Sequence, residues 1–236
     1  KVVVSYQVQV NTVSAPASVS NQGTVSFTGG TPVLTDDSAL LGTTDPTLTP
    51  VTSLLTVTGR VWNDANGGVT QDGSEAGTNA GSSTLTVYVV DSAGNVVDKA
   101  TVAADGTYTL TNVPVSSSIT LRLSNDSSVA VGSSVPAASL PAGWTNTGEI
   151  VDGTTETTTL GEIAITTTTT ALANQNFGIE QLPETSAVTA TAMPNTNGDT
   201  PLASTPLAGT DADGTVASFK IVTIPAATEG VLEWDD

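Results

Sequence analysis

Cysteine and histidine are both absent from this chain of 236 residues. Without cysteine no disulfide can form, and without either residue the usual ligands of zinc are missing. Nucleophiles of the Cys–His and Ser–His types are excluded for the same reason. We therefore expect the fold to be stabilised by core packing, by assembly, or by a cation bound through oxygen atoms.

Basic residues are scarce, because five Lys and Arg stand against 23 Asp and Glu and leave a formal net charge of −18. Binding to nucleic acid or to an anionic membrane surface requires clustered Lys and Arg. We therefore expect no nucleic-acid partner. Long apolar runs are also missing, so we expect no membrane span. The first residue is Lys1 and no signal peptide is visible, which favours a processed product or an excerpt of a longer chain.

Aromatic residues are few, with three each of Trp, Tyr and Phe. A glycoside hydrolase needs two carboxylates about 5 to 9 Å apart across a sugar site. The acidic residues here form no cluster with aromatic and basic partners, so we expect no enzyme. An adhesive module that binds a carbohydrate, or a host or neighbour-cell ligand, is the alternative function. It would be supported by Trp144 exposed on a flat face beside Tyr88 or Tyr108.

Threonine and valine dominate the sequence, and both favour β-strands because their branched Cβ packs well on a pleated sheet. Apolar and polar residues alternate over 55–61, 85–89 and 119–123, as is typical of half-buried strands. Gly-containing turn sequences at 93–95 and 104–106 separate such segments. The pattern predicts an all-β fold built from sandwiches or barrels.

The segment 61–77 is rich in carboxylate, amide and glycine residues and follows directly on the strand predicted for 55–61. Calcium prefers six to eight oxygen ligands from carboxylates, amides and backbone carbonyls. The sequence predicts a Ca²⁺ site in this loop, and an ordinary solvated turn with acidic side chains is the alternative. The predicted ligands are Asn63, Asp64, Asn66, Asp72 and Glu75.

The same loop reads V-W-N-D-A-N-G-G-V-T-Q-D-G-S-E-A-G, and three further motifs follow it: L-T-V-Y-V-V-D-S-A-G-N-V-V, A-D-G-T-Y-T-L-T-N-V-P and N-Q-N-F-G-I. Together they resemble the serine–aspartate-repeat B-type domain of large bacterial surface adhesins. The resemblance covers roughly residues 54–182. It implies a prealbumin-like β-sandwich whose first loop binds calcium. Gly68 departs from the pattern, because the family usually has an acidic residue at that position.

We expect three blocks: 1–53, the C-terminal part of an Ig-like surface repeat; 54–182, the B-type sandwich; and 183–236, the start of another Ig-like or cadherin-like repeat. The third block contains T-D-A-D-G at 210–214. Asp211 and Asp213 are therefore further candidate calcium ligands, although the same sequence also builds an ordinary hairpin turn.

The two end blocks are each about half as long as an Ig-like sandwich, which takes about 100 residues. They are cut from a larger repeat protein, or they are small domains, or they are incomplete sandwiches that a neighbouring subunit completes. The last explanation would use the first strand of the chain as a donated strand. Its alternating residues are Val2, Val4, Tyr6, Val8 and Val10.

These features predict a structural, stalk- or fibre-forming segment of an extracellular cell-surface protein. Its partners would be neighbouring copies of itself or neighbouring domains of a longer chain. Calcium would stiffen it, because a cation that binds the folded arrangement alone stabilises that arrangement.

Overall fold

The computed structural model describes residues 7, 9, 18–73, 75–156, 159–189, 207–224, 226 and 228, and their regular structure is entirely β. This confirms the predicted all-β class. The predicted division into three blocks of tandem domains stays a prediction. The described part of the chain contains no helix that could span a membrane. The strands, in chain order, are β1 (Ser18–Asn21), β2 (Thr24–Val25), β3 (Val33–Leu34), β4 (Thr47–Pro50), β5 (Leu54–Asn63), β6 (Thr86–Val90), β7 (Val96–Thr101), β8 (Thr107–Pro114), β9 (Ser118–Ser124), β10 (Trp144–Val151), β11 (Thr154–Glu156), β12 (Glu162–Thr166), β13 (Gln175–Gln181), β14 (Glu184–Thr185) and β15 (Gly209–Thr210).

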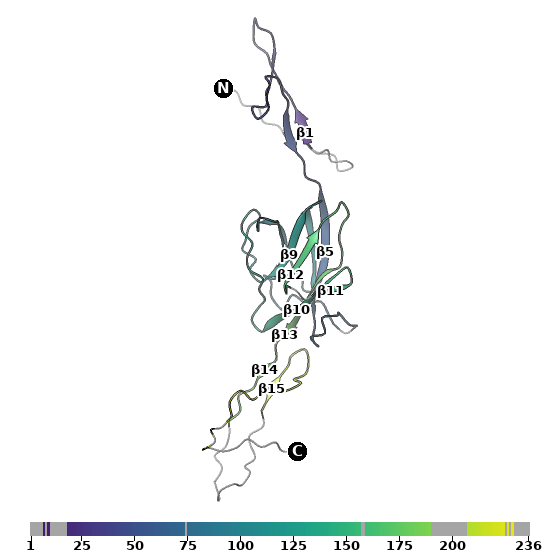
Figure 1. Cartoon of the computed structure of the whole chain (residues 1–236), viewed down its shortest axis with the longest axis vertical. Coiled ribbons are helices and arrows are strands. Elements are labelled where there is room, and N and C mark those ends of the chain that lie inside the picture. Colours follow the sequence, from purple (N-terminus) through teal and green to yellow (C-terminus); the bar gives the residue numbers. More distant parts are fainter. Residues whose placement is uncertain are drawn as a thin grey trace, which may run out of the picture.

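Two larger sheets form a sandwich in the middle of an elongated molecule (Figure 1). One sheet has five strands in the order β11-β10-β13-β5-β8, and the other has four in the order β12-β9-β6-β7. The chain passes repeatedly from one sheet to the other, so that β5, β8 and β13 lie in one layer while β6, β9 and β12 lie in the opposite one.

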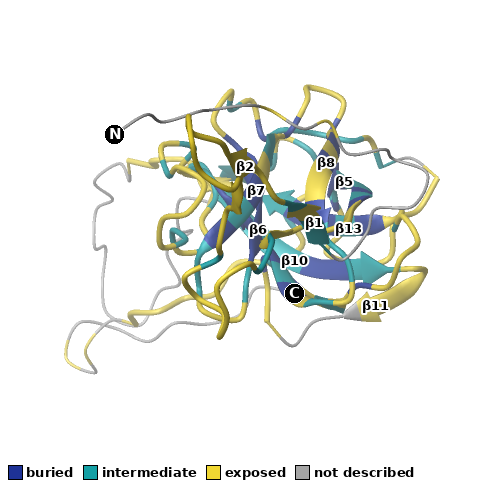
Figure 2. Cartoon of the chain, turned by 90° about the horizontal axis from the view of Figure 1, so that it is seen from above, coloured by how far each residue is buried: buried dark blue, intermediate teal, exposed yellow. Residues whose placement is uncertain are grey.

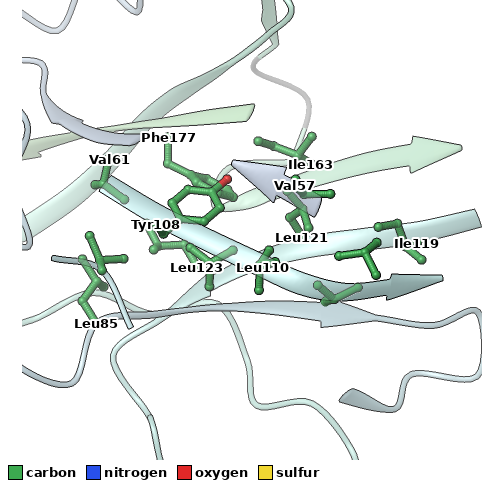
Figure 3. Packing of buried hydrophobic residues seen from close by; sticks show 14 of the residues in the cluster. Val57, Val61, Leu85, Tyr108, Leu110, Ile119, Leu121, Leu123, Ile163 and Phe177 are labelled. Atoms are coloured by element: carbon green, nitrogen blue, oxygen red, sulfur yellow. The ribbon is translucent and has the colours of Figure 1, made fainter. Parts of the chain in front are cut away.

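The core lies between the two sheets and consists mainly of inward-facing residues of their strands (Figure 3). Tyr108 of β8 and Phe177 of β13 meet there with ring centroids 6.3 Å apart. Each such side chain contributes about 1.5–3 kcal/mol by leaving water. The strands predicted from alternation are therefore held by burial of one face. Residues with no exposed surface include Val57, Val61, Leu85, Val87, Leu110, Val113, Leu121, Leu123, Phe177 and Ile179.

The pair β5–β13 is parallel, with Val61 opposite Phe177 and Asn63 opposite Ile179. An isolated parallel bridge between Val57 and Leu172 continues the contact toward the start of β5. The two strands therefore finish at the same end of the sandwich, which we call the exit pole. The chain enters the sandwich at the opposite end, where β5 begins at Leu54.

Three separate two-stranded sheets flank the sandwich: β1–β4, β2–β3 and β14–β15. Strands β2, β3 and β4 are exposed along their whole length, whereas burial is concentrated in the sandwich strands (Figure 2). Strand β1 lies toward one end of the molecule and β14 and β15 toward the other (Figure 1). The predicted donor-strand residues Val2, Val4, Tyr6, Val8 and Val10 lie outside the described residues.

Candidate cation site at the exit pole

The loop that follows β5, residues 64–76, begins at the exit pole because β5 ends there, and we call it the acidic loop. The backbone N–H of Asp64 donates to the carbonyl oxygen of Ile179 in β13 at 2.8 Å. The returning end of the loop is fixed by the N–H of Asn63, which donates to the carbonyl of Ala76 at 2.9 Å. Both ends of the loop are thus anchored to the sandwich, and the residues between them project from its pole.

Asp64 organises the first half of the loop. Its side chain is completely buried, and its two oxygens accept from the backbone N–H groups of Gly68 (2.9 Å) and Val69 (2.8 Å). The Gly68 N–H also donates to Asn66 Oδ1 at 2.7 Å. A carboxylate that accepts such bonds fixes the path of a turn. Gly68, where the resembled family has an acid, thus contributes through its backbone N–H.

The second half of the loop is tied together by its own polar side chains. Asn66 Nδ2 donates to Asp72 Oδ2 at 2.9 Å, and the N–H of Asp72 donates to Glu75 Oε2 at 3.0 Å. The N–H of Glu75 returns a bond to the carbonyl of Asp72 at 3.2 Å. Asp72 is exposed. These contacts hold Glu75 at the inner side of the loop.

The Asp211–Gly214 turn lies against this loop, although it is far away in the sequence. Asp211 Oδ1 accepts from the N–H groups of Asp213 (3.4 Å) and Gly214 (3.2 Å), which shapes the turn. Gln181, the last residue of β13, donates its N–H to Asp213 Oδ2 at 3.3 Å. A Cβ atom at Gly214 would lie 2.8 Å from the Ala65 carbonyl oxygen, so loop and turn are in close contact.

A cavity of about 790 Å³ lies between the loop and the turn, and we call it the cation cavity. Five of the seven predicted ligands line it, and Glu180 of β13 is a sixth carboxylate or amide side chain in its wall, which the sequence did not predict. Asp64 and Asp72 are not in the lining. No Lys or Arg is among the lining residues, which are Asn63, Ala65, Asn66, Glu75, Ala76, Glu180, Asp211, Asp213, Gly214, Thr215 and Ala217.

Three oxygen atoms in this wall are buried and have no hydrogen-bond partner among the described residues: Asn63 Oδ1, Glu75 Oε1 and Asp213 Oδ1. A buried polar atom without a partner costs about 1–3 kcal/mol, and more when it carries charge. Such atoms are rare in folded proteins and call for a ligand or another compensating group. Two of the three come from the loop region and one from the turn.

The electrostatics of the cavity disfavour the ionised form of its glutamates. Burial raises the pKa of Glu75, and the negative charges of Asp64 and Asp72 raise it further against a hydrogen bond from the Asp72 backbone. Burial also raises the pKa of Glu180, with the charges of Asp64, Asp213 and Asp211 acting in the same direction. A cation in the cavity would relieve this repulsion.

The residues present fit a hard cation. The polar side chains that line the cavity offer carboxylate and amide oxygens, the ligands that Ca²⁺ prefers. A bound cation would also give the three buried oxygens the partner that they lack. In the described part of the chain, no group of three or more acidic side chains is gathered closely enough to hold a metal ion. Binding would therefore require the walls of the cavity to move together.

The tryptophans and tyrosines do not form an aromatic platform. Trp62 is fully buried beside the loop, and Tyr108 is buried in the core between the sheets. Tyr88 is buried in a separate cluster with Val90 and Val96, and Trp144 is partly buried and packs against the core. The arrangement that would have supported a carbohydrate surface at Trp144 is thus not present in the described residues.

A scan against protein-family models and a search of curated proteins found no match to this chain. The resemblance to the adhesin B-type domain therefore rests on the motifs quoted above.

Proposed function

We propose that the chain is a structural, stalk- or fibre-forming segment of an extracellular cell-surface protein. In this proposal calcium stiffens the segment at the exit pole, and neighbouring copies join head to tail. The chain has no catalytic role in this proposal.

The observation that carries the proposal is the exposure of large apolar side chains at both ends of the molecule. Before the sandwich the exposed fraction is 58% for Val25 and 60% for Phe27. After it, the fraction is 85% for Val222 and 67% for Ile224. Contiguous apolar patches mark interfaces, and each end exposes large apolar residues that lie close together in the sequence.

The sheets that carry or adjoin these side chains are too small to be stable alone. A two-stranded sheet is marginal in water and needs packing against another element. Because the two ends lie on opposite sides of the sandwich (Figure 1), contact between unlike ends would extend a chain of copies rather than close a dimer. Strand addition across the junction would also cover the open edges.

Calcium would give the segment the stiffness that covalent cross-links give to other surface proteins, since the chain has no cysteine with which to form a disulfide. The ion would offset the repulsion among acidic side chains only when they are gathered in the folded arrangement, so binding would stabilise that arrangement. No observation favours the alternative of an adhesive carbohydrate-binding module.

The experiment is sedimentation of the full chain in calcium over a range of concentrations. We expect the mass of the wild-type chain to rise with concentration. Val25→Glu and Val222→Glu should each remain monomeric, because each has one disabled end. Their mixture should stop at dimers, because each variant still has one intact end.

The matched control is Val131→Glu, since Val131 is a sandwich residue with an exposed fraction of 59%, against 58% for Val25. It should assemble like the wild-type chain. A wild-type chain that stays monomeric at every concentration would contradict the proposal, and so would equal effects of the changes at Val25 and Val131.

A further inference from the structure

We propose that the acidic loop and the Asp211–Gly214 turn hold one hard cation between them, with Glu180 in the shared wall. The cation would then fix the segment that follows β13 to the exit pole and set the angle between them. This inference rests on the calcium role proposed above and adds a second partner, the turn, to the same site.

The buried oxygen atoms without a hydrogen-bond partner come from both sides of the cavity. Glu75 Oε1 and Asn63 Oδ1 belong to the loop region and Asp213 Oδ1 belongs to the turn, and all three are buried without a partner. All three residues line the same cavity. A site made by the loop alone would leave the buried oxygen of Asp213 without an explanation.

Among the described residues, direct hydrogen bonding joins the turn weakly to the end of β13. The bond from the Gln181 N–H to Asp213 Oδ2 is long, at 3.3 Å. Across the same junction the negative charges of Asp64, Asp211 and Asp213 repel the carboxylate of Glu180. A divalent cation converts this repulsion into attraction, because it is then the largest local charge.

The number of oxygen atoms available to a calcium ion also depends on more than the loop. Calcium takes six to eight oxygens, and carboxylates can supply two each. The cavity is lined by the carboxylates of Glu75, Glu180, Asp211 and Asp213 and by the amides of Asn63 and Asn66. The loop side alone offers four such oxygens, two from Glu75 and one each from Asn63 and Asn66, so Glu180 or the turn must add to them before six are reached.

The first test is calcium titration of the full chain by calorimetry. We expect Glu75→Gln on the loop side, and Asp213→Asn on the turn side, to weaken affinity by about 10-fold or more. Glu180→Gln should do the same. The control is Glu184→Gln, which removes the same charge four residues along the chain, on exposed β14 outside the cavity lining. It should leave affinity within about twofold.

The second test measures the junction itself. The chain has no cysteine, so Ser92→Cys on the sandwich and Thr223→Cys beyond the turn give two unique sites for spin labels. Both residues are exposed. With labelled chain diluted in unlabelled chain, we expect calcium to narrow the distribution of distances between the labels. In an Asp213→Asn background that narrowing should be lost.

The outcomes separate this inference from the proposal beneath it. If calcium binds and Asp213→Asn leaves affinity and distances unchanged, the loop binds the ion alone and the shared site is wrong. If the wild-type chain does not bind calcium, both the calcium role and the shared site are wrong. Loss of affinity in Glu184→Gln equal to that in Glu180→Gln would also overturn the site, because general charge would then explain the binding.

Discussion

Asp64 carries two structural duties in one buried side chain, since each of its oxygens accepts a backbone N–H within the loop. The sequence predicts Asp64 as a cation ligand, but a carboxylate beside Asn and Gly is equally suited to accept backbone hydrogen bonds in a turn. Short-range bonds to nearby N–H groups are available without any ion, and here they occupy Asp64. Because Asp64 is not among the residues that line the cavity, its role in the proposed cation site would be to hold the loop in shape rather than to bind the ion.

Replacing Asp64 should therefore weaken the fold even without calcium. Hydrogen bonds to a charged group are worth about 1.5–3 kcal/mol each, so Asp64→Ala should lower the free energy of unfolding by about 3–5 kcal/mol. The measurement is urea unfolding of the full chain in excess chelator and again in saturating calcium.

Asp72→Ala is the comparison, because Asp72 is exposed and its side chain accepts from the Asn66 amide. Its loss in chelator should be below about 1 kcal/mol. If Asp64→Ala matched the wild-type chain in chelator and differed from it in calcium, Asp64 would be a ligand rather than a support.

Glu180 lines the cavity but was not among the ligands predicted from the sequence. The composition of the loop was enough to predict ligands there. Glu180, in contrast, stands alone in N-F-G-I-E-Q with no acidic neighbour. Its membership of the site depends on where β13 ends in space. No local pattern contains that information.

At the level of strands, alternation predicted the elements but not their neighbours. The segments 55–61 and 119–123 lie in β5 and β9, and 85–89 lies in β6 except for Leu85, because a period of two fixes which face is buried. The parallel pairing of β5 with β13 joins residues more than a hundred positions apart. That pairing brings the loop and the turn to one pole, and alternation does not determine it.

The turn before β8 is also an anchor for β5. Gly106 has a φ of 82°, and its carbonyl accepts from the N–H of Val61 at 2.8 Å. A Cβ atom there would collide with the Val61 carbonyl oxygen and lie 2.7 Å from the backbone nitrogen of Thr78. This position therefore requires glycine for its conformation and for its space.

Gly106→Ala should consequently destabilise the sandwich much more than Gly94→Ala. Gly94 has a similar φ of 84° but no atom within 4 Å of the added Cβ. We expect a loss of about 1–2 kcal/mol at Gly94, from the left-handed conformation alone. At Gly106 the backbone collision should bring the total to about 3 kcal/mol or more. Urea unfolding compares the two, and equal losses would show that the β5 anchor can move aside.

For the whole molecule, net charge would set the conditions of the proposed assembly. With a net charge of −18, neighbouring copies repel one another as they approach. Sequence composition was enough to predict this repulsion, and it is also the basis of the expectation that the chain has no nucleic-acid partner. The arrangement of the flanking blocks was harder to foresee, because short exposed strands without a buried face carry little pattern.

Salt should therefore strengthen head-to-tail association. The screening length falls from about 10 Å at 0.1 M to about 3 Å at 1 M salt, while apolar contacts persist. Sedimentation at fixed protein and calcium concentrations should show larger assemblies as NaCl rises over that range. Val25→Glu should stay monomeric throughout. Smaller assemblies at high salt would mean that attraction between opposite charges holds the copies together.

The parallel pairing of β5 and β13 also determines how the sandwich responds to pulling. The chain enters at Leu54, leaves at Gln181 at the far pole, and these two residues belong to the two adjacent strands. Tension applied along a fibre would slide β13 past β5 lengthwise. All rungs of their ladder would then be strained together rather than opened one after another, so the strands that bring the cation ligands together would also resist extension under force.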